Sequence, residues 1–199
     1  ADEGLVRMLL EEQIDFDVAG RGDDLSRFET IVVPSHTGVL AGAEAQIERY
    51  LAGGGSLVIL GAGALNEAGN ATAIDCGGRF VSCPAVDVDY TLVGEALRVP
   101  QTRGTAPLAR KAMLPGTPFL NYSASLAFEL NPGSELLATV EDPYFSRTYG
   151  HYCGHQNTPN KPNVTARPAA WRNGSVVVIA HALDRMYYAL GAKVHRDYF

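Results

Sequence analysis

The sequence predicts an α/β protein with a mainly parallel sheet and a β-rich second half. Three observations carry this prediction. Residues Thr30–Leu65 read as strand, loop, helix, glycine stop and strand, which is one βαβ unit. Ser56–Leu60 is an uninterrupted apolar strand, typical of a parallel sheet covered on both faces. After Gly69 the predicted elements become short and β-rich, and Pro and Gly separate them.

The N-terminal third begins with a predicted helix over Asp2–Gln13. Its apolar residues recur at helical spacing, at Leu5, Val6, Leu9 and Leu10. Ile14–Val18 reads I-D-F-D-V, and this strict alternation predicts a short strand. The polar residues of Ala19–Glu29 predict a connecting loop.

The βαβ unit follows this loop. Thr30–Val33 is predicted as a buried strand, which Pro34 ends. Ala41–Leu51 has the pattern of a helix with one apolar side, and Gly53–Gly55 supplies its stop. We therefore expect the first third of the chain to run α-β-β-α-β.

The second half is predicted to be mostly strands, at Arg79–Cys83, Val86–Val93, Ala96–Val99, Phe119–Tyr122 and Glu135–Val140. Pro168–Arg172 and Ser175–Ala180 flank Asn173-Gly174, the strongest hairpin signal in the chain. Leu183–Leu190 is predicted as a helix.

Composition narrows the class of protein. The length of 199 residues suits one domain over residues 1–199, and the net charge of −6 argues against a nucleic-acid partner. No apolar run reaches the roughly 18 residues that span a membrane, so no membrane partner is expected. Three cysteines favour free thiols in a reducing compartment, and we expect a cytoplasmic protein. The chain starts without Met and ends without a polar tail, so we expect a piece truncated at both ends.

Two loops of the βαβ unit stand where α/β sheets bind ligands. The turn Gly61–Leu65 holds no Cys, Ser or Thr, so it lacks a nucleophile, and its glycines suit a tight turn. Ser35 and His36 lie in the loop after the first strand of the unit. Adjacent residues rarely form a nucleophile–base pair, so we interpret them as binding candidates in a polar crevice loop.

The densest polar stretch spans residues 147–158. On an extended chain His151, Cys153 and His155 point the same way, which makes them a weak candidate for a metal site. A cysteine near histidines also has the composition of a thiol nucleophile. The third interpretation is a packed, hydrogen-bonded loop at the edge of the sheet. The binding candidates of this stretch are Arg147, Tyr149, His151, His155, Gln156 and Asn157.

Other ionisable residues are interpreted as structural. Asp87 and Asp89 alternate on a predicted strand and are expected to be solvated, as are the adjacent Glu141 and Asp142. His181 follows a buried strand and is expected to be a core histidine with its hydrogen bonds satisfied.

Several segments together resemble a known family. L-L-E-E-Q-I-D-F-D-V, D-D-L-S-R-F-E-T-I-V-V-P and I-E-R-Y-L-A-G-G-G-S-L-V-I-L-G resemble the β-galactosidase trimerisation domain of multidomain glycoside hydrolases. P-Y-F-S-R-T-Y-G-H-Y-C-G-H-Q-N-T-P and V-V-V-I-A-H-A-L-D-R-M-Y-Y-A-L-G are similar to the matching region of a bacterial glycosyl hydrolase family with a TIM barrel ahead of this domain.

The resemblance implies a flavodoxin-like fold of the class I glutamine-amidotransferase type. It implies that the catalytic acids lie in a preceding barrel, and that this domain is a non-catalytic accessory that packs against that barrel or against other subunits. The amidotransferase cysteine is missing from Gly61–Leu65, so no such activity is carried over. We expect a homo-oligomer, no cofactor, and carbohydrate as one candidate partner. The alternatives are a small hydrolase or thiol enzyme using Cys153 with His151 or His155, and a sugar- or small-molecule-binding module.

Overall fold

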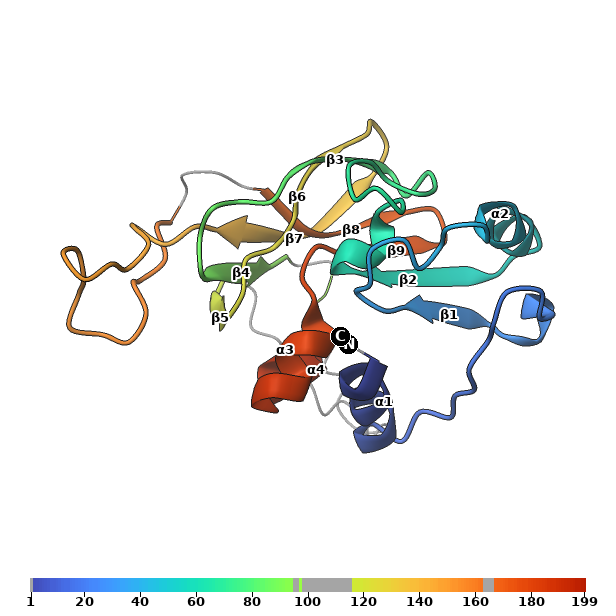
Figure 1. Cartoon of the computed structure of the whole chain (residues 1–199), viewed down its shortest axis with the longest axis horizontal. Helices are drawn as coiled ribbons and strands as arrows, with labels where there is room; N and C mark the ends of the chain where they lie inside the picture. Colours follow the sequence, from blue (N-terminus) through green and yellow to red (C-terminus); the bar gives the residue numbers. More distant parts are fainter. Residues whose placement is uncertain (1, 95–96, 98–115, 163–166) are drawn as a thin grey trace, which may run out of the picture.

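The computed structural model describes residues 2–94, 97, 116–162 and 167–199, and it shows a mixed α/β fold (Figure 1). Seven strands form one sheet in the order β1-β2-β9-β8-β7-β4-β5, and β3 and β6 form a small second sheet. The strands are β1 Thr30–Val33, β2 Ser56–Leu60, β3 Gly78–Ser82, β4 Asp89–Val93, β5 Phe119–Asn121, β6 Ala127–Leu130, β7 Glu135–Glu141, β8 Arg167–Asn173 and β9 Val176–Ile179. The helices are α1 Asp2–Glu11, α2 Glu44–Ala52, α3 Leu183–Leu190 and α4 Lys193–Tyr198, with short 3₁₀ turns η1 Leu25–Arg27 and η2 Gly61–Ala64.

The predicted βαβ unit is present. β1 and β2 pair in parallel, with Val33 opposite Ile59, and α2 connects them. The helix ends at Ala52 with Gly53 as its C-cap, and Gly54 takes the positive φ, at 94°. Gly55 is required by packing, because a Cβ there would lie 2.2 Å from the ring of Tyr50. The Tyr50 hydroxyl bonds the Ser56 backbone and so ties the end of the helix to the start of β2.

The sheet is mixed rather than mainly parallel. β9 adds in parallel to β2, whereas β8, β7, β4 and β5 follow in antiparallel pairs. The predicted hairpin around Asn173-Gly174 is confirmed, with Asn173 opposite Val176 and Gly174 at a positive φ of 57°. A hairpin joins antiparallel strands. β8 therefore runs in the opposite direction to β9 and to the parallel strands β1 and β2.

The predicted strand Ile14–Val18 is wrong. These residues are extended but pair with no strand in the described part of the chain, and all of them are exposed. An alternating sequence forms a strand only when a neighbouring strand supplies hydrogen bonds, and no strand of the described residues does so for residues 14–18. The predicted strand Ala96–Val99 lies outside the described residues except for Leu97. The sequence patterns also missed β6 and α4.

Two cores cover the two faces of the large sheet. Alternate residues of β2 divide between them, with Leu57 and Ile59 in one core and Leu60 in the other. The first core packs against α2 and the small sheet, around Trp171. The second packs against α1, α3 and α4. None of the helices in the described residues has the length and apolar content needed to cross a membrane.

Candidate functional site

A protruding arm follows β7 and carries most of the predicted binding residues. We define the arm as residues 143–160, which extend away from the sheet as an orange loop in Figure 1. Its two ends are joined at the base, where Pro143 and Asn160 form a β-bridge and the Tyr144 N–H donates to the Pro159 carbonyl at 3.1 Å. The Tyr90 hydroxyl donates to the Thr158 carbonyl at 2.8 Å and anchors the base to β4.

The tip of the arm is a tight turn. The Thr148 N–H donates to the His151 carbonyl at 2.9 Å, and the His151 N–H donates back to the Thr148 carbonyl at 3.2 Å. The imidazole of His151 stacks on the ring of Phe145, with centroids 3.8 Å apart and planes 14° apart. Arg147 donates to the Gln156 carbonyl and so joins the two halves of the arm. Each of these contacts links residues on opposite sides of the loop.

The arm displays three tyrosines to solvent. Tyr149 at the tip is fully exposed, Tyr152 is 69% exposed and Tyr144 is 58% exposed. A Cβ added at Gly150 or Gly154 would meet no atom within 4 Å, which shows that the tip stands clear of the rest of the described chain. Ordered, exposed aromatic side chains are typical of surfaces that another molecule covers.

The arm does not gather its histidines and cysteine into a reactive group. His151 stacks on Phe145, while the Cys153 thiol donates weakly to the carbonyls of His155 and Asn157, at 3.6 and 3.8 Å. Among the described residues, no group of three His, Cys, Asp or Glu side chains is placed to hold a metal ion. The alignment of His151, Cys153 and His155 expected for an extended chain is therefore lost in the turns of the arm.

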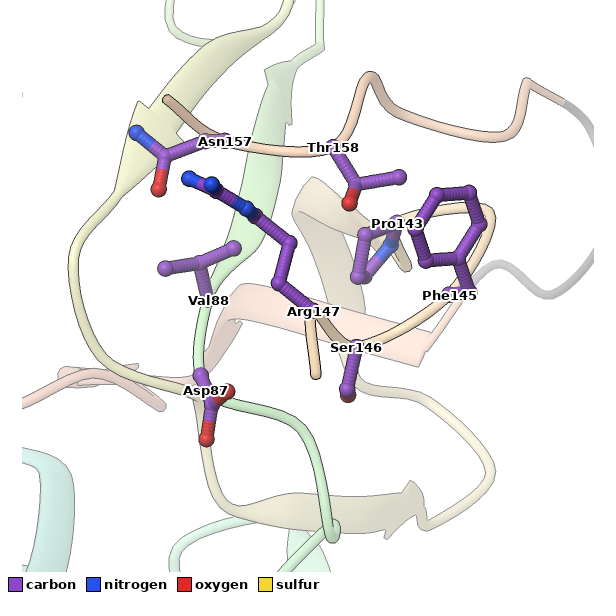
Figure 2. A pocket seen from close by; sticks show the side chains of 8 residues that line it. All are labelled: Asp87, Val88, Pro143, Phe145, Ser146, Arg147, Asn157 and Thr158. Atoms are coloured by element: carbon purple, nitrogen blue, oxygen red, sulfur yellow. The ribbon is translucent and has the colours of Figure 1, made fainter. Parts of the chain in front are cut away.

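A small hollow lies at the base of the arm (Figure 2). It holds about 40 Å³ and is lined by Asp87 and Val88 of the segment before β4 and by arm residues including Phe145, Arg147 and Thr158. Ligand pockets for drug-sized molecules measure roughly 300–1,000 Å³. The hollow has room for a few water molecules and is too small for a sugar ring.

A buried polar network lies at the same end of the sheet, beneath the arm. Asp89 is fully buried, and its carboxylate accepts from His181 Nε2 at 2.7 Å and from the Ser125 N–H and hydroxyl at 2.8 Å each. Asn121 donates to Asp89 at 3.0 Å and to Thr91 at 2.8 Å. The expectation that Asp89 is solvated is wrong, because Asp89, Thr91 and Val93 are the residues of β4 that face inward. His181 is a core histidine as expected, although its Nδ1 has no partner in the described residues.

The charge of Asp89 is stabilised by its neighbours. Burial alone would raise the pKa of this carboxyl, but the charge and hydrogen bond of His181 and the hydrogen bonds from Ser125 outweigh burial and lower the pKa. The nearby His195 is also buried, and burial lowers its pKa.

Hydrogen bonds connect this network to the base of the arm. The Arg167 guanidinium donates to the Ser125 hydroxyl at 3.4 Å and to Asp142, which directly precedes the arm. Asn160, at the other end of the arm, donates to the Glu141 carboxylate at 2.5 Å. The adjacent acids Glu141 and Asp142 therefore anchor the arm and are not simply solvated.

The network is not arranged for nucleophilic catalysis. A serine nucleophile needs its hydroxyl bonded to the base, with the acid behind the base. Here Ser125 and His181 bond the same carboxylate, and both are buried. At the predicted elbow the glycines serve packing, since a Cβ at Gly63 would lie 2.3 Å from the Pro34 carbonyl.

The crevice loop is separate from the arm. Ser35 is buried and donates from its N–H and hydroxyl to Asp184 at 2.8 and 2.5 Å, which ties the end of β1 to α3. His36 bonds Asp2 at 2.9 Å on the surface. β1 lies at one edge of the sheet and the arm extends beyond the other end (Figure 1), so the structure does not bring the two groups of predicted binding residues together.

Comparison with known proteins identifies solved structures of the same fold. No protein-family model matches the sequence, and none of the curated proteins is significantly similar to it. The structure is similar to α-L-fucosidase isoenzyme 2 from Paenibacillus thiaminolyticus, with a TM-score of 0.80 and 24% identity over 98% of this chain and 27% of that chain. It is also similar to a family 42 β-galactosidase from G. stearothermophilus, with a TM-score of 0.57 and 14% identity over 98% of this chain and 24% of that chain.

A β-galactosidase from Bacillus circulans sp. alkalophilus is a further neighbour, with a TM-score of 0.55 and 15% identity over 94% of this chain and 25% of that chain. All three neighbours are glycoside hydrolases. At these identities the similarity concerns the fold. The chain spans about a quarter of the length of each.

Proposed function

We propose that this chain is a non-catalytic accessory and assembly domain of a glycoside hydrolase-type protein, with the β-galactosidase trimerisation-like, amidotransferase-like fold. It packs against a catalytic barrel of the same polypeptide or against other subunits. In this proposal the barrel supplies the catalytic acids and this domain supplies contact surface. The arm is the contact element, and it also shapes the surroundings of a neighbouring carbohydrate site.

The observation that carries the proposal is the ordered exposure of the arm. Tyr149 and Tyr152 are exposed on a turn that backbone hydrogen bonds and the Phe145–His151 stack already hold in shape. A rigid loop loses little conformational entropy on binding, and tyrosine supplies a large contact area with few rotatable bonds. Such a loop is therefore suited to being covered by a partner.

The geometry disfavours the alternative of a thiol enzyme. Cys153 bonds two carbonyl oxygens rather than an imidazole, and one of the two candidate histidines stacks on Phe145. The hollow beside the arm is also too small for a sugar, so it is not the site of a sugar-binding module. The similarity to glycoside hydrolases over a quarter of their length supports a role within a larger protein.

The test is a double substitution on the arm in the full gene product that carries this chain. We expect Tyr149→Ala with Tyr152→Ala to weaken the docking of this domain or of its subunits at least tenfold, because each lost contact tyrosine costs about 1 kcal/mol or more. Assembly is measured by sedimentation velocity and glycoside hydrolysis by a chromogenic substrate.

Tyr188→Ala is the control for the loss of an exposed tyrosine outside the arm, on α3. The arm variant should unfold at the wild-type temperature, since Tyr149 and Tyr152 lie in neither core, whereas Tyr188→Ala also loses a hydrogen bond to Glu3 of α1. If the arm variant assembles and hydrolyses substrate like the control, the arm is not a contact element and the proposal fails.

A further inference from the structure

The hollow at the base of the arm has hydrogen-bond donors along one side. It is lined there by the side chains of Arg147, Asn157 and Thr158, and Asp87 lies at its other side (Figure 2). In Figure 2 the Arg147 guanidinium points towards Asn157, and the Thr158 hydroxyl is directed into the space beside Arg147. A guanidinium, a side-chain amide and a hydroxyl can all donate hydrogen bonds, so together they suit a ligand with anionic oxygen atoms.

Thr158 has a hydroxyl that the described residues leave unsatisfied. The residue is only 2% exposed, and its Oγ1 has no hydrogen-bond partner in the described part of the chain. Buried hydroxyls are normally paired, because an unpaired one costs free energy. The residue is also held in place, since its carbonyl accepts from the Tyr90 hydroxyl at 2.8 Å. The hydroxyl is therefore fixed at the wall of the hollow, where a bound group would satisfy it.

Arg147 supplies the charge, and the volume of the hollow limits the size of the ligand. One nitrogen of Arg147 donates to the Gln156 carbonyl, which holds the side chain across the arm. A guanidinium has more N–H donors than this bond uses, in a planar fork that matches a carboxylate. The hollow of about 40 Å³ admits a carboxylate group, which is only slightly larger than a water molecule. The ligand is therefore a small terminal group rather than a ring.

The charge of the arm also favours an acidic partner. Residues 143–160 contain no Asp or Glu, although the whole chain has 22 of them and a net charge of −6. The arm carries Arg147, and its two histidines, His151 and His155, add positive charge when they are protonated. An acidic surface therefore meets less repulsion at the arm than it does on average over the rest of the chain.

We infer that the hollow binds the carboxylate of an Asp or Glu side chain, on the domain or subunit against which the arm docks. The inference rests on the proposed function of the arm and names the chemistry of its partner. Arg147 pairs with the carboxylate charge, while Thr158 and Asn157 donate hydrogen bonds to its oxygen atoms. The exposed tyrosines of the arm supply contact area, and the buried carboxylate fixes the register of docking.

Asp87 distinguishes this ligand from a cationic one. It is exposed, and it lies at the opposite side of the hollow from the Arg147 guanidinium (Figure 2). Its charge repels a bound carboxylate, although solvent weakens the repulsion. Removing this charge should therefore strengthen the docking of a carboxylate and weaken the docking of a Lys or Arg side chain. The two partner chemistries give results of opposite sign.

The test uses two substitutions in the full gene product that carries this chain. Docking is measured as subunit association by sedimentation velocity and as protection of the arm amides from hydrogen exchange. Thr158→Val removes the hydroxyl with little change of shape and should weaken docking about tenfold. The same variant should unfold at or above the wild-type temperature, because the lost hydroxyl has no partner in the described chain. Asp87→Asn should strengthen docking about threefold.

Two controls accompany these variants. Glu48→Gln removes an exposed carboxylate from α2, at the far end of the molecule from the arm, and should dock like the wild type (Figure 1). Sodium acetate should weaken wild-type docking more than sodium chloride does at the same ionic strength, because acetate competes for the hollow. In Thr158→Val this difference between the two salts should be smaller.

Two outcomes would overturn the inference. If Thr158→Val docks like the wild type, water alone satisfies the hydroxyl and no partner group enters the hollow. If Asp87→Asn weakens docking, the hollow receives a cationic side chain instead. The tyrosine variant of the arm separates the two proposals. If it weakens docking while Thr158→Val and Asp87→Asn do not change it, the arm remains a contact element and the carboxylate site fails.

Discussion

Asp89 shows how one carboxylate organises the interior beneath the arm. It joins β4 to His181 after β9 and to Ser125 before β6, so three separated parts of the chain meet at one side chain. Burying a charge is costly unless a partner compensates it, and here His181 and three N–H or O–H donors do so. Losing one partner of Asp89 should therefore lower the free energy of unfolding much more than losing a surface ion pair does.

Replacing His181 should test this difference. We expect His181→Ala to lower the free energy of unfolding by about 3–5 kcal/mol, because it leaves a buried carboxylate without its main partner. His36→Ala also removes a histidine–aspartate pair, but that pair is exposed and should cost no more than about 1 kcal/mol. Urea denaturation measures both. Equal losses in the two variants would show that the Asp89–His181 pair does not stabilise the fold as described.

At the scale of elements, α1 and α3 approach each other closely enough to exclude a side chain between them. Gly4 of α1 faces the backbone of Asp184 in α3, and a Cβ at Gly4 would lie 1.8 Å from the Asp184 carbonyl oxygen. Asp184 in turn accepts from Ser35 at the end of β1. The position of α1 against the sheet therefore depends on the absence of one side chain.

Gly4→Ala should show whether helix propensity or packing has the larger effect on stability at this position. In an isolated helix alanine is better than glycine by about 1 kcal/mol, so propensity alone predicts a stabilised protein. The clash at 1.8 Å is with backbone, which places its cost at the upper end of the about 1–3 kcal/mol typical of overpacking, so we expect a net loss of about 2 kcal/mol. Gly150→Ala in the arm, where nothing lies within 4 Å, is the control and should be neutral. A Gly4→Ala variant at least as stable as the wild type in chemical denaturation would contradict the described packing.

At the scale of the whole molecule, carboxylates with lowered pKa values link stability to pH. The pKa of Asp89 is lowered, and hydrogen bonds from Tyr187, Arg7 and Arg196 lower the pKa of Glu11 to about 2. Glu11 belongs to α1 while Tyr187 and Arg196 belong to α3 and α4, so its ionised form joins three helices. Protonation of either carboxyl removes contacts that cross the fold.

The sign of the pH dependence follows from these lowered values. A carboxyl with a lower pKa in the folded state contributes stability above its unfolded value, which is about 4, and loses it as the pH falls. We expect the free energy of unfolding to decrease gently from about pH 7 to 5, because burial lowers the pKa of His195 and the unfolded chain then binds more protons than the folded one. It should decrease more steeply from about pH 5 towards 2, where the carboxyls are protonated. Denaturant titrations across this range measure it. In Asp89→Asn the free energy of unfolding should decrease less steeply as the pH falls. An unchanged slope would show that Asp89 does not contribute to the pH dependence.

The sequence by itself determined the elements with strong local patterns. The βαβ unit of residues 30–60, the Asn173-Gly174 hairpin and the helix Leu183–Leu190 all appear where periodicity and turn residues predict them. The polar stretch that forms the arm was also identified from composition. These features depend on neighbours a few residues away, so the local sequence contains the information that specifies them.

Only the tertiary structure decided how those elements meet. Periodicity does not state which strand a segment pairs with, so the insertion of β9 beside β2 and the unpaired state of residues 14–18 could not be derived from it. The Asp89–His181 pair joins residues 92 positions apart, and alternation along β4 does not say which face is buried. The arm likewise depends on backbone hydrogen bonds and one ring stack between residues that the sequence pattern does not pair. Long-range pairing depends on complementary surfaces formed during folding. Those surfaces determine which polar groups form the buried network and which segments stay exposed.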